Sequence, residues 1–179
     1  MLKTFMRALV SGFGKRYDYD VSYMRELIDT DPAAFMAFSN VQGLGGYRKA
    51  PPQALIAARL VATLAEDCGP CTQIVVSMGE EQGIDPAVLK AILTGDEAAM
   101  GPDAALAWRF ARASLARDME AADPLRDEIV RRWGRKALAA LALGIASARV
   151  FPTVKYALGH GKTCSKVQVR GEAVAPKAA

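Results

Sequence analysis

The feature that most constrains this chain is a proline that recurs directly after an aspartate, a glycine or another proline. A proline fits the first turn of a helix, where its missing N–H forgoes no bond, and a preceding aspartate caps that helix. Glycine is typical of the residue that ends a helix, and glycines follow several of the apolar segments, as at Gly95 and Gly134. The pattern predicts a series of short helices. They are expected to begin at Asp31-Pro32, Pro51-Pro52, Gly69-Pro70, Asp85-Pro86, Gly101-Pro102 and Asp123-Pro124.

The composition favours the same fold class. Hydrophobic residues make up 51% of the chain and aromatic residues 7%. Ala and Leu supply most of the apolar content, which favours helix over strand. Alternating apolar and polar stretches are short, as at Lys166–Arg170. Because 179 residues are enough for one core, we expect an all-α protein with a single helical domain over residues 1–161.

Charge is distributed unevenly along the chain. The formal net charge is +4 and the pI is about 9.0. Residues 162–179 hold four basic side chains and one acidic side chain, so the rest of the chain is nearly neutral. A basic tail on a neutral body is a weak electrostatic match for a polyanion. We therefore expect residues 162–179 to form a basic, mobile tail, and we expect no nucleic acid among the partners.

The sequence predicts neither a membrane span nor export. The most apolar run, Ala137–Ala148, is followed directly by Arg149 and is shorter than the roughly 20 residues that a bilayer requires. Met1–Phe13 contains Lys3 and Arg7 without the continuous apolar stretch of a signal peptide. It predicts instead an amphipathic helix that packs on the body or on a partner. Three cysteines do not indicate a disulfide framework. We therefore expect a cytoplasmic protein without membrane contact.

The motif with the clearest chemistry is CGPC, formed by Cys68 and Cys71 at the start of a predicted helix. Cysteines at this spacing lie about one helical turn apart, near enough to close a disulfide without backbone movement. Free backbone N–H groups and the positive end of the helix stabilise a thiolate there. Glu66 and Asp67 act in the opposite direction, because neighbouring carboxylates raise the pKa of a thiol. The alternative is a pair of small buried side chains that never react.

The surroundings of this motif resemble the alkylhydroperoxidase D-like, or carboxymuconolactone decarboxylase, superfamily. The shared pattern is a proline-started apolar helix, a CxxC, an amphipathic helix ending in glycine, and a short helix closed by another glycine. Here it reads PPQALIAARLVATLAEDCGPCTQIVVSMGEEQGIDPAVLKAILTG, and the resemblance covers about residues 31–158. It implies an all-helical fold and a homo-oligomer, either a trimer or a hexamer. It also implies a cysteine pair that reduces hydroperoxides and is restored by a thiol reductant protein.

Only Cys68 and Cys71 carry over from the resemblance. Peroxidase members have a histidine four residues after the second cysteine and a glutamate twelve residues before the first. The corresponding positions here are Val75 and Ile56, and neither side chain can carry a proton. The sequence therefore lacks the acid–base groups that the resemblance implies.

Other side chains near the motif are candidates for a substitute relay. One is Glu66. Another is Thr72, which follows Cys68 by one helical turn and is expected to hydrogen-bond its sulfur. Arg59 falls on the Glu66 side of the same predicted helix. It is expected to pair with Glu66 or to favour a thiolate; the alternative is a structural ion pair at the end of a long apolar stem.

His160 and Cys164 offer a different arrangement. Together with Cys68 and Cys71 they make a Cys₃His set, which is a recognised set of zinc ligands. However, 88 residues separate Cys71 from His160, and the second half falls at the predicted tail. The alternative is a solvated histidine and a free thiol. We therefore predict no metal ion and no cofactor.

Two functions from different classes follow from these residues. The first is a thiol-dependent enzyme that reduces hydroperoxides or exchanges thiols with disulfides through Cys68 and Cys71. The second is a catalytically silent helical oligomer that acts as a binding or structural module. Catalysis requires a sulfur that a substrate can reach, whereas a silent module allows both to be sealed. The attacking sulfur stays open, because helix position favours Cys68 as the thiol of lower pKa and burial can reverse that order.

Overall fold

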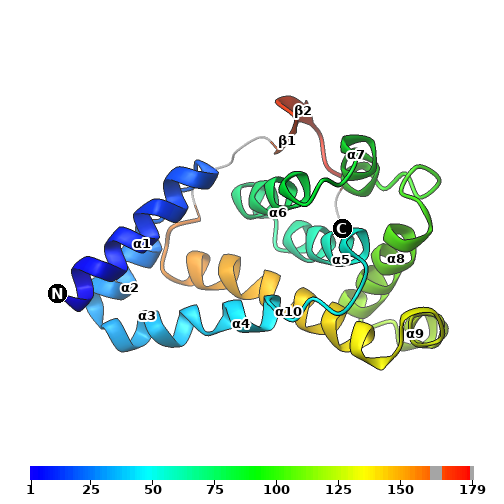
Figure 1. Ribbon diagram of the computed structural model, residues 1–179, viewed down its shortest axis with the longest axis horizontal. Helices are drawn as coiled ribbons and strands as arrows, with labels where there is room; N and C mark the ends of the chain where they lie inside the picture. Colours follow the sequence, from blue (N-terminus) through cyan, green and yellow to red (C-terminus); the bar gives the residue numbers. More distant parts are fainter. Residues whose placement is uncertain (162–166, 178–179) are drawn as a thin grey trace.

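The computed structural model describes residues 1–161 and 167–177, which form a helical protein with one small hairpin (Figure 1). The prediction of an all-α protein is confirmed apart from that hairpin. In chain order the elements are α1 (Leu2–Tyr17), α2 (Ser22–Thr30), α3 (Pro32–Ser39), α4 (Val41–Gly45), α5 (Pro52–Ala65), α6 (Gly69–Glu81), α7 (Pro86–Thr94), α8 (Pro102–Ala116), α9 (Met119–Trp133), α10 (Arg135–Ala157), β1 (Val167–Val169) and β2 (Glu172–Val174).

Five of the helices begin where the proline pairs predict. Proline lies in the first turn of α3, α5, α6, α7 and α8. Asp31 and Asp85 cap α3 and α7, since each carboxylate accepts a 2.8 Å hydrogen bond from the backbone N–H two residues later. Gly95 ends α7 in the left-handed conformation, with φ 73°, which glycine adopts without steric cost.

The helix predicted to begin at Asp123-Pro124 begins earlier, at Met119. Asp118 caps it, because its carboxylate accepts a 3.0 Å hydrogen bond from the backbone N–H three residues later. Arg117 ends α8 in the left-handed conformation, which turns the chain directly into α9. Pro124 therefore lies inside α9, where it forgoes one backbone hydrogen bond.

The larger apolar core is built around α5. Every residue from Ala54 to Thr63 is buried, because α5 packs against α6, α8 and α10 on different sides. Leu60, Ile92 and Leu141, from three different helices, are fully buried in this core. The all-round burial explains why the apolar residues of α5 cover every face instead of one stripe.

α10 is longer than its most apolar run. Within the residues that the structure describes, it is the one helix whose length and composition would allow it to cross a membrane. The most apolar run of the sequence ends at Ala148, whereas the helix continues to Ala157. Inside the protein, 44% of its most apolar window is buried, and Ala140 and Leu141 belong to the main core. α10 is therefore a partly buried helix that contributes to the main core.

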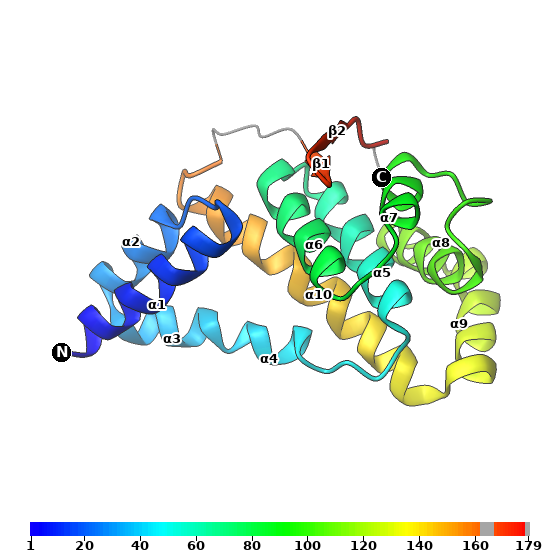
Figure 2. The same ribbon diagram turned by 45° about the horizontal axis from the view of Figure 1, so that its top comes forward.

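The N-terminal helices form a second apolar cluster at the other end of the molecule (Figure 2). Met6 and Val10 of α1 are buried in it together with Tyr23 and Ile28 of α2. The predicted amphipathic helix at the N-terminus therefore packs on the body. Phe151 near the end of α10 joins this cluster, so α10 runs from one cluster to the other.

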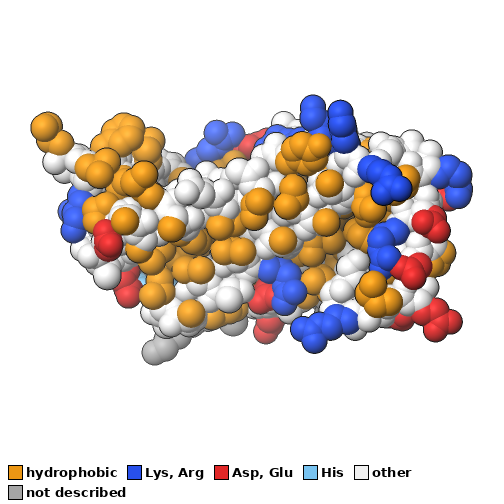
Figure 3. Space-filling model, turned by 90° about the horizontal axis from the view of Figure 1, so that it is seen from below, with side chains coloured by type: hydrophobic (Ala, Val, Ile, Leu, Met, Phe, Trp, Pro, Cys, Tyr) orange, Lys and Arg blue, Asp and Glu red, His pale blue; other side chains and the backbone are white. Residues whose placement is uncertain are grey.

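α1 also presents apolar side chains to solvent. Leu2, Phe5 and Leu9 are 55%, 63% and 58% exposed, beside the buried Met6 and Val10. Figure 3 shows hydrophobic side chains gathered at the end of the molecule that holds the N-terminus. α1 therefore has apolar side chains both on the face that packs on the body and on an exposed stripe formed by Leu2, Phe5 and Leu9.

Part of the predicted mobile tail is folded on the body. β1 and β2 pair antiparallel, and Val167 and Val169 are 4% and 0% exposed within the main core. The side-chain amide of Gln73 on α6 accepts a 2.7 Å hydrogen bond from the N–H of Gln168 and donates a 3.1 Å bond to its carbonyl oxygen. The alternation noted in the sequence therefore reflects a buried strand. The tail prediction for residues 162–166 and 178–179 lies outside the described residues.

Candidate functional site

Cys68 and Cys71 form a disulfide where α5 gives way to α6. Their Cα atoms lie 5.3 Å apart, within the usual range for a disulfide. Cys68 is the N-cap residue of α6, and Cys71 lies in its first turn, as the motif predicts. Both residues are buried, with 2% and 5% of their surface exposed.

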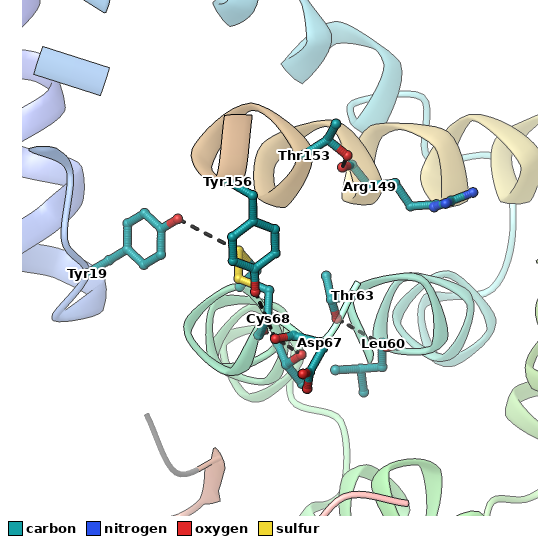
Figure 4. Close-up of a disulfide and its surroundings, with 10 residues drawn as sticks. Tyr19, Leu60, Thr63, Asp67, Cys68, Arg149, Thr153 and Tyr156 are labelled. Atoms are coloured by element: carbon teal, nitrogen blue, oxygen red, sulfur yellow. Dashed lines mark hydrogen bonds between the residues drawn. A yellow bond between two sulfur atoms is a disulfide. The ribbon is translucent and has the colours of Figure 1, made fainter. Parts of the chain in front are cut away.

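α5 ends just before the motif because of the backbone conformation of Asp67. Asp67 adopts the left-handed conformation, with φ 49°, so α5 cannot continue into α6. The hydroxyl of Tyr156 on α10 donates a 2.8 Å hydrogen bond to the carbonyl oxygen of Asp67 (Figure 4). Gly69 and Pro70 then form the first turn of α6. This hydrogen bond thus holds the junction between α5 and α6 to α10.

Thr72 and Glu66 have partners other than those predicted. The Thr72 hydroxyl donates to the backbone carbonyl oxygen of Cys68 at 3.0 Å instead of to its sulfur, because that carbonyl lies one turn back along the helix. Glu66 pairs with Arg149 of α10, at 2.5 Å between Oε1 and Nε, and not with Arg59. Both side chains therefore support the helix junction.

Tyr19, which lies outside the motif, faces the disulfide. Its Oη is 3.7 Å from the Sγ of Cys71 (Figure 4), and because a disulfide sulfur carries no proton, the hydroxyl is the donor. Asp18 ends α1 in the left-handed conformation, and Gly14 allows the chain to return closely, since a Cβ there would lie 3.0 Å from the Tyr19 carbonyl oxygen. The sequence analysis missed Tyr19, because it is 52 positions from Cys71 and precedes the segment that the resemblance covers.

Burial determines the protonation of Tyr19. It raises the pKa of the phenol, so the hydroxyl stays protonated at neutral pH and remains a hydrogen-bond donor. Lys155 of α10, which is 1% exposed, places its Nζ 5.2 Å from the centroid of the Tyr19 ring. Burial lowers the pKa of Lys155, while the nearby Asp20 acts in the opposite direction.

A cavity of about 300 Å³ lies beside Cys71, where the N-terminal cluster meets the central helices. Its polar lining includes Arg48, Arg59 and Ser147, and Cys71 is the member of the cysteine pair that lines it. A molecule in the cavity would therefore lie beside Cys71 and not beside Cys68. The apolar side chains of the wall include Phe13, Met24, Ile74, Val75, Met78 and Phe151.

Arg59 is buried in the wall of this cavity, with 7% of its surface exposed. Its Nη2 donates a hydrogen bond to the carbonyl oxygen of Gly45, while its Nε has no partner among the described residues. The predicted pairing with Glu66 is wrong, because Arg59 reaches toward α4 and Glu66 pairs with Arg149. Burial, followed by the positive charge of Arg48, lowers the pKa of Arg59, yet a guanidinium stays charged at neutral pH.

The four side chains of the alternative zinc set are not brought together as far as the structure describes them. Cys68 and Cys71 are bonded to each other, and the Nε2 of His160 lies 2.6 Å from a carboxylate oxygen of Glu26. Cys164 lies outside the described residues. Over residues 1–161 and 167–177, no group of three His, Cys, Asp or Glu side chains is placed to hold a metal ion.

Comparisons with protein-family models, with curated proteins and with solved structures found no match for this chain. The resemblance to the alkylhydroperoxidase D-like superfamily therefore stays a prediction. Val75 lines the cavity as an apolar side chain, and Ile56 is fully buried in the main core. Neither position of the expected histidine and glutamate supplies an ionisable group, so any proton donor must come from elsewhere in the fold.

Proposed function

We propose that this protein is a thiol-dependent redox enzyme in which Cys71 reduces a hydroperoxide held in the cavity and Cys68 closes the disulfide. The observation that carries the proposal is the position of Cys71, which lines a cavity of about 300 Å³ and is also bonded to Cys68. A redox pair needs one sulfur that a substrate reaches and a second within bonding distance. The lining position of Cys71 and its bond to Cys68 support this role.

The reaction begins with Cys71 as the thiolate. Its sulfur attacks the outer oxygen of the hydroperoxide, forming an S–O bond as the O–O bond breaks. The leaving alkoxide takes a proton from the Tyr19 hydroxyl beside Cys71 and departs as an alcohol. The Tyr19 phenolate then takes up from water the proton that water received when the Cys71 thiol ionised. Cys71 is left as a sulfenic acid. Tyr19 thus supplies the proton donor that Val75 cannot.

The second step regenerates a closed pair. The sulfur of Cys68 attacks the sulfur of Cys71, an S–S bond forms, and the oxygen leaves as water with the proton of the Cys68 thiol. The hydroperoxide has been reduced by two electrons and the two thiols oxidised to a disulfide. An external dithiol then reduces the disulfide through thiol–disulfide exchange. This order makes Cys71 the attacking residue and Cys68 the resolving residue.

The short spacing of the cysteines also favours a redox role over a structural one. The pair is separated by three positions, and the chain-entropy model assigns so small a loop about 2 kcal/mol, against about 4.7 kcal/mol for a loop of 100 residues. The large core around α5 already supplies a buried interior. Because this disulfide contributes so little to the stability of the fold, a reversible redox role suits it better than a structural role.

The remaining predictions belong to the same proposal. We propose an alkylhydroperoxidase D-like arrangement of the helices, a cytoplasmic location where thiol reductants are abundant, and a reductant protein as partner. We also propose a homo-oligomer, with the exposed stripe of Leu2, Phe5 and Leu9 as its contact surface. Sedimentation of the wild type beside a variant with these three residues changed to serine tests the oligomer, and a monomeric wild type would exclude it.

The decisive experiment for the function follows hydroperoxide consumption in a Cys164→Ser background, so that thiol counts report Cys68 and Cys71 alone. We expect turnover with an excess of dithiol, and none after Cys71→Ser. In the Cys68→Ser variant, dimedone should trap a sulfenic acid on Cys71. A sulfenic acid found on Cys68 in the Cys71→Ser variant would reverse the assignment.

A second control examines the proton donor. Tyr19→Phe keeps the ring and removes the hydroxyl, and we expect the rate of peroxide reduction to fall by about 10²-fold, the lower end of general-acid contributions. If wild type and Cys71→Ser consume hydroperoxide equally slowly, the redox proposal fails. The protein would then be the catalytically silent binding module that its buried sulfur atoms also allow.

A further inference from the structure

Arg59 is a buried cation whose charge is not neutralised by any carboxylate among the described residues. It is 7% exposed, and its Nη2 donates a hydrogen bond to the carbonyl oxygen of Gly45. Its Nε is buried without a partner in residues 1–161 and 167–177. The charge that acts on it most is that of Arg48, which has the same sign. Burying a charge without a counter-charge is costly, so the arrangement calls for an anion.

The cavity provides the space for that anion. Arg48 and Arg59 both line it, and its lining contains no Asp or Glu among the described residues. The other walls are largely apolar, with Phe13, Ile74 and Phe151 among them. An inorganic anion would leave these walls in contact with water, whereas an organic anion would cover them.

The guanidinium is held in place by backbone on two sides. A Cβ built on Gly144 of α10 would lie 3.4 Å from Nε of Arg59, and one built on Gly45 of α4 would lie 3.8 Å from Nη2. Both glycines let the helices approach Arg59 closely, and the bond to the Gly45 carbonyl fixes its direction. The donor is therefore pre-organised, which lowers the cost of binding a ligand.

We propose that this cavity binds a small organic monoanion, with its carboxylate at Arg59 and Arg48 and its hydrocarbon part along the apolar wall. A volume of about 300 Å³ corresponds to about ten water molecules at liquid density, so the ligand is a short-chain or single-ring acid. As a statement about substrate, this inference rests on the proposed redox function: the substrate would be a carboxylate-bearing hydroperoxide whose peroxide group reaches Cys71. The binding of an organic anion in the cavity does not require that the protein reduce hydroperoxides.

The test compares an acid with its neutral analogue. Octanoate and octanamide have the same number of non-hydrogen atoms and differ in charge, and benzoate and benzamide form a second matched pair. Isothermal titration of the full-length protein should show at least tenfold tighter binding of one acid than of its amide, a difference of about 1.4 kcal/mol. In Arg59→Met this preference should disappear. Arg59→Lys keeps a charge without the fork of donors and should retain part of it.

A control variant keeps the result interpretable. Arg126 is paired with Asp123 on α9, so Arg126→Met removes an arginine from another part of the surface and should leave binding unchanged.

The outcomes separate the two proposals. Equal affinity for acid and amide, no measurable heat with either pair at millimolar ligand, or acid binding that survives Arg59→Met unchanged would overturn the anion site. Acid binding without any peroxide turnover would keep the anion site and remove the redox function. Turnover of neutral hydroperoxides, without tighter binding of acids than of amides, would keep the redox function and exclude the anion site.

Discussion

The guanidinium of Arg59, which no carboxylate neutralises among the described residues, has a consequence for stability that is opposite to the usual effect of a core substitution. Most changes at a residue that is only 7% exposed destabilise a protein. Arg59→Met keeps an unbranched stem as far as the position of Nε and removes the buried charge. We therefore predict that this variant is more stable than the wild type.

The magnitude follows from two opposing contributions. A buried ion that lacks a counter-charge costs several kcal/mol, and the unpaired Nε is part of that cost. The variant loses the hydrogen bond to the Gly45 carbonyl, and a bond from a charged donor contributes about 1.5–3 kcal/mol. The net expectation is a gain of about 1–3 kcal/mol, and each kcal/mol corresponds to about 2–4 °C in Tm for a chain of this size.

Urea unfolding followed by circular dichroism measures this gain. The midpoint should rise while the slope m stays unchanged, since the surface exposed on unfolding is the same. Arg59→Lys, which keeps the charge, should not be stabilised, and Arg126→Met should stay within about 0.5 kcal/mol of wild type. A loss of more than about 1 kcal/mol in Arg59→Met would refute the reasoning, because it would mean that the guanidinium holds α4 and α10 together.

Four further predictions concern other parts of the fold. Reduction of the disulfide should lower the free energy of unfolding by only about 2 kcal/mol, with helix content unchanged by circular dichroism; complete unfolding on reduction would show a structural bond. Gly79→Ala should destabilise the protein by about 1–3 kcal/mol, because its Cβ would lie 2.8 Å from a buried methyl of Leu89. Gly12→Ala, with open space around it, should stabilise α1 by up to about 1 kcal/mol; urea midpoints that move in the same direction for both would contradict this. Because burial lowers the pKa of Lys155 in the folded state, the unfolded chain binds more protons as pH approaches 10.5, and stability should rise with pH. Lys155→Met lacks this titrating group, so raising the pH from about 7 to about 9.5, below the titration of Tyr19, should bring the free energy of unfolding of wild type closer to that of the variant. A difference in the free energy of unfolding that stays constant would argue against this pKa shift.

Some contacts of the site were beyond sequence reasoning because their partners are remote in the chain. Tyr19 reaches Cys71 only because the turn between α1 and α2 lies beside the start of α6, and no periodicity relates residues 52 positions apart. Glu66 pairs with Arg149, 83 positions away, although a sequence reading places Arg59 two turns from it on the same helix. The hairpin had a local signal in its alternating valines, but its burial depends on the amide of Gln73.

The sequence by itself determined the features that depend on a few neighbouring residues. Asp31 and Asp85 cap their helices, proline starts them, and the spacing of Cys68 and Cys71 brings their Cα atoms to 5.3 Å, because capping, proline geometry and disulfide reach all act within about one helical turn. The packing of the helices settles which cysteine lines the cavity and buries Arg59 without a counter-charge among the described residues. Those outcomes depend on how whole helices pack, which no short segment encodes.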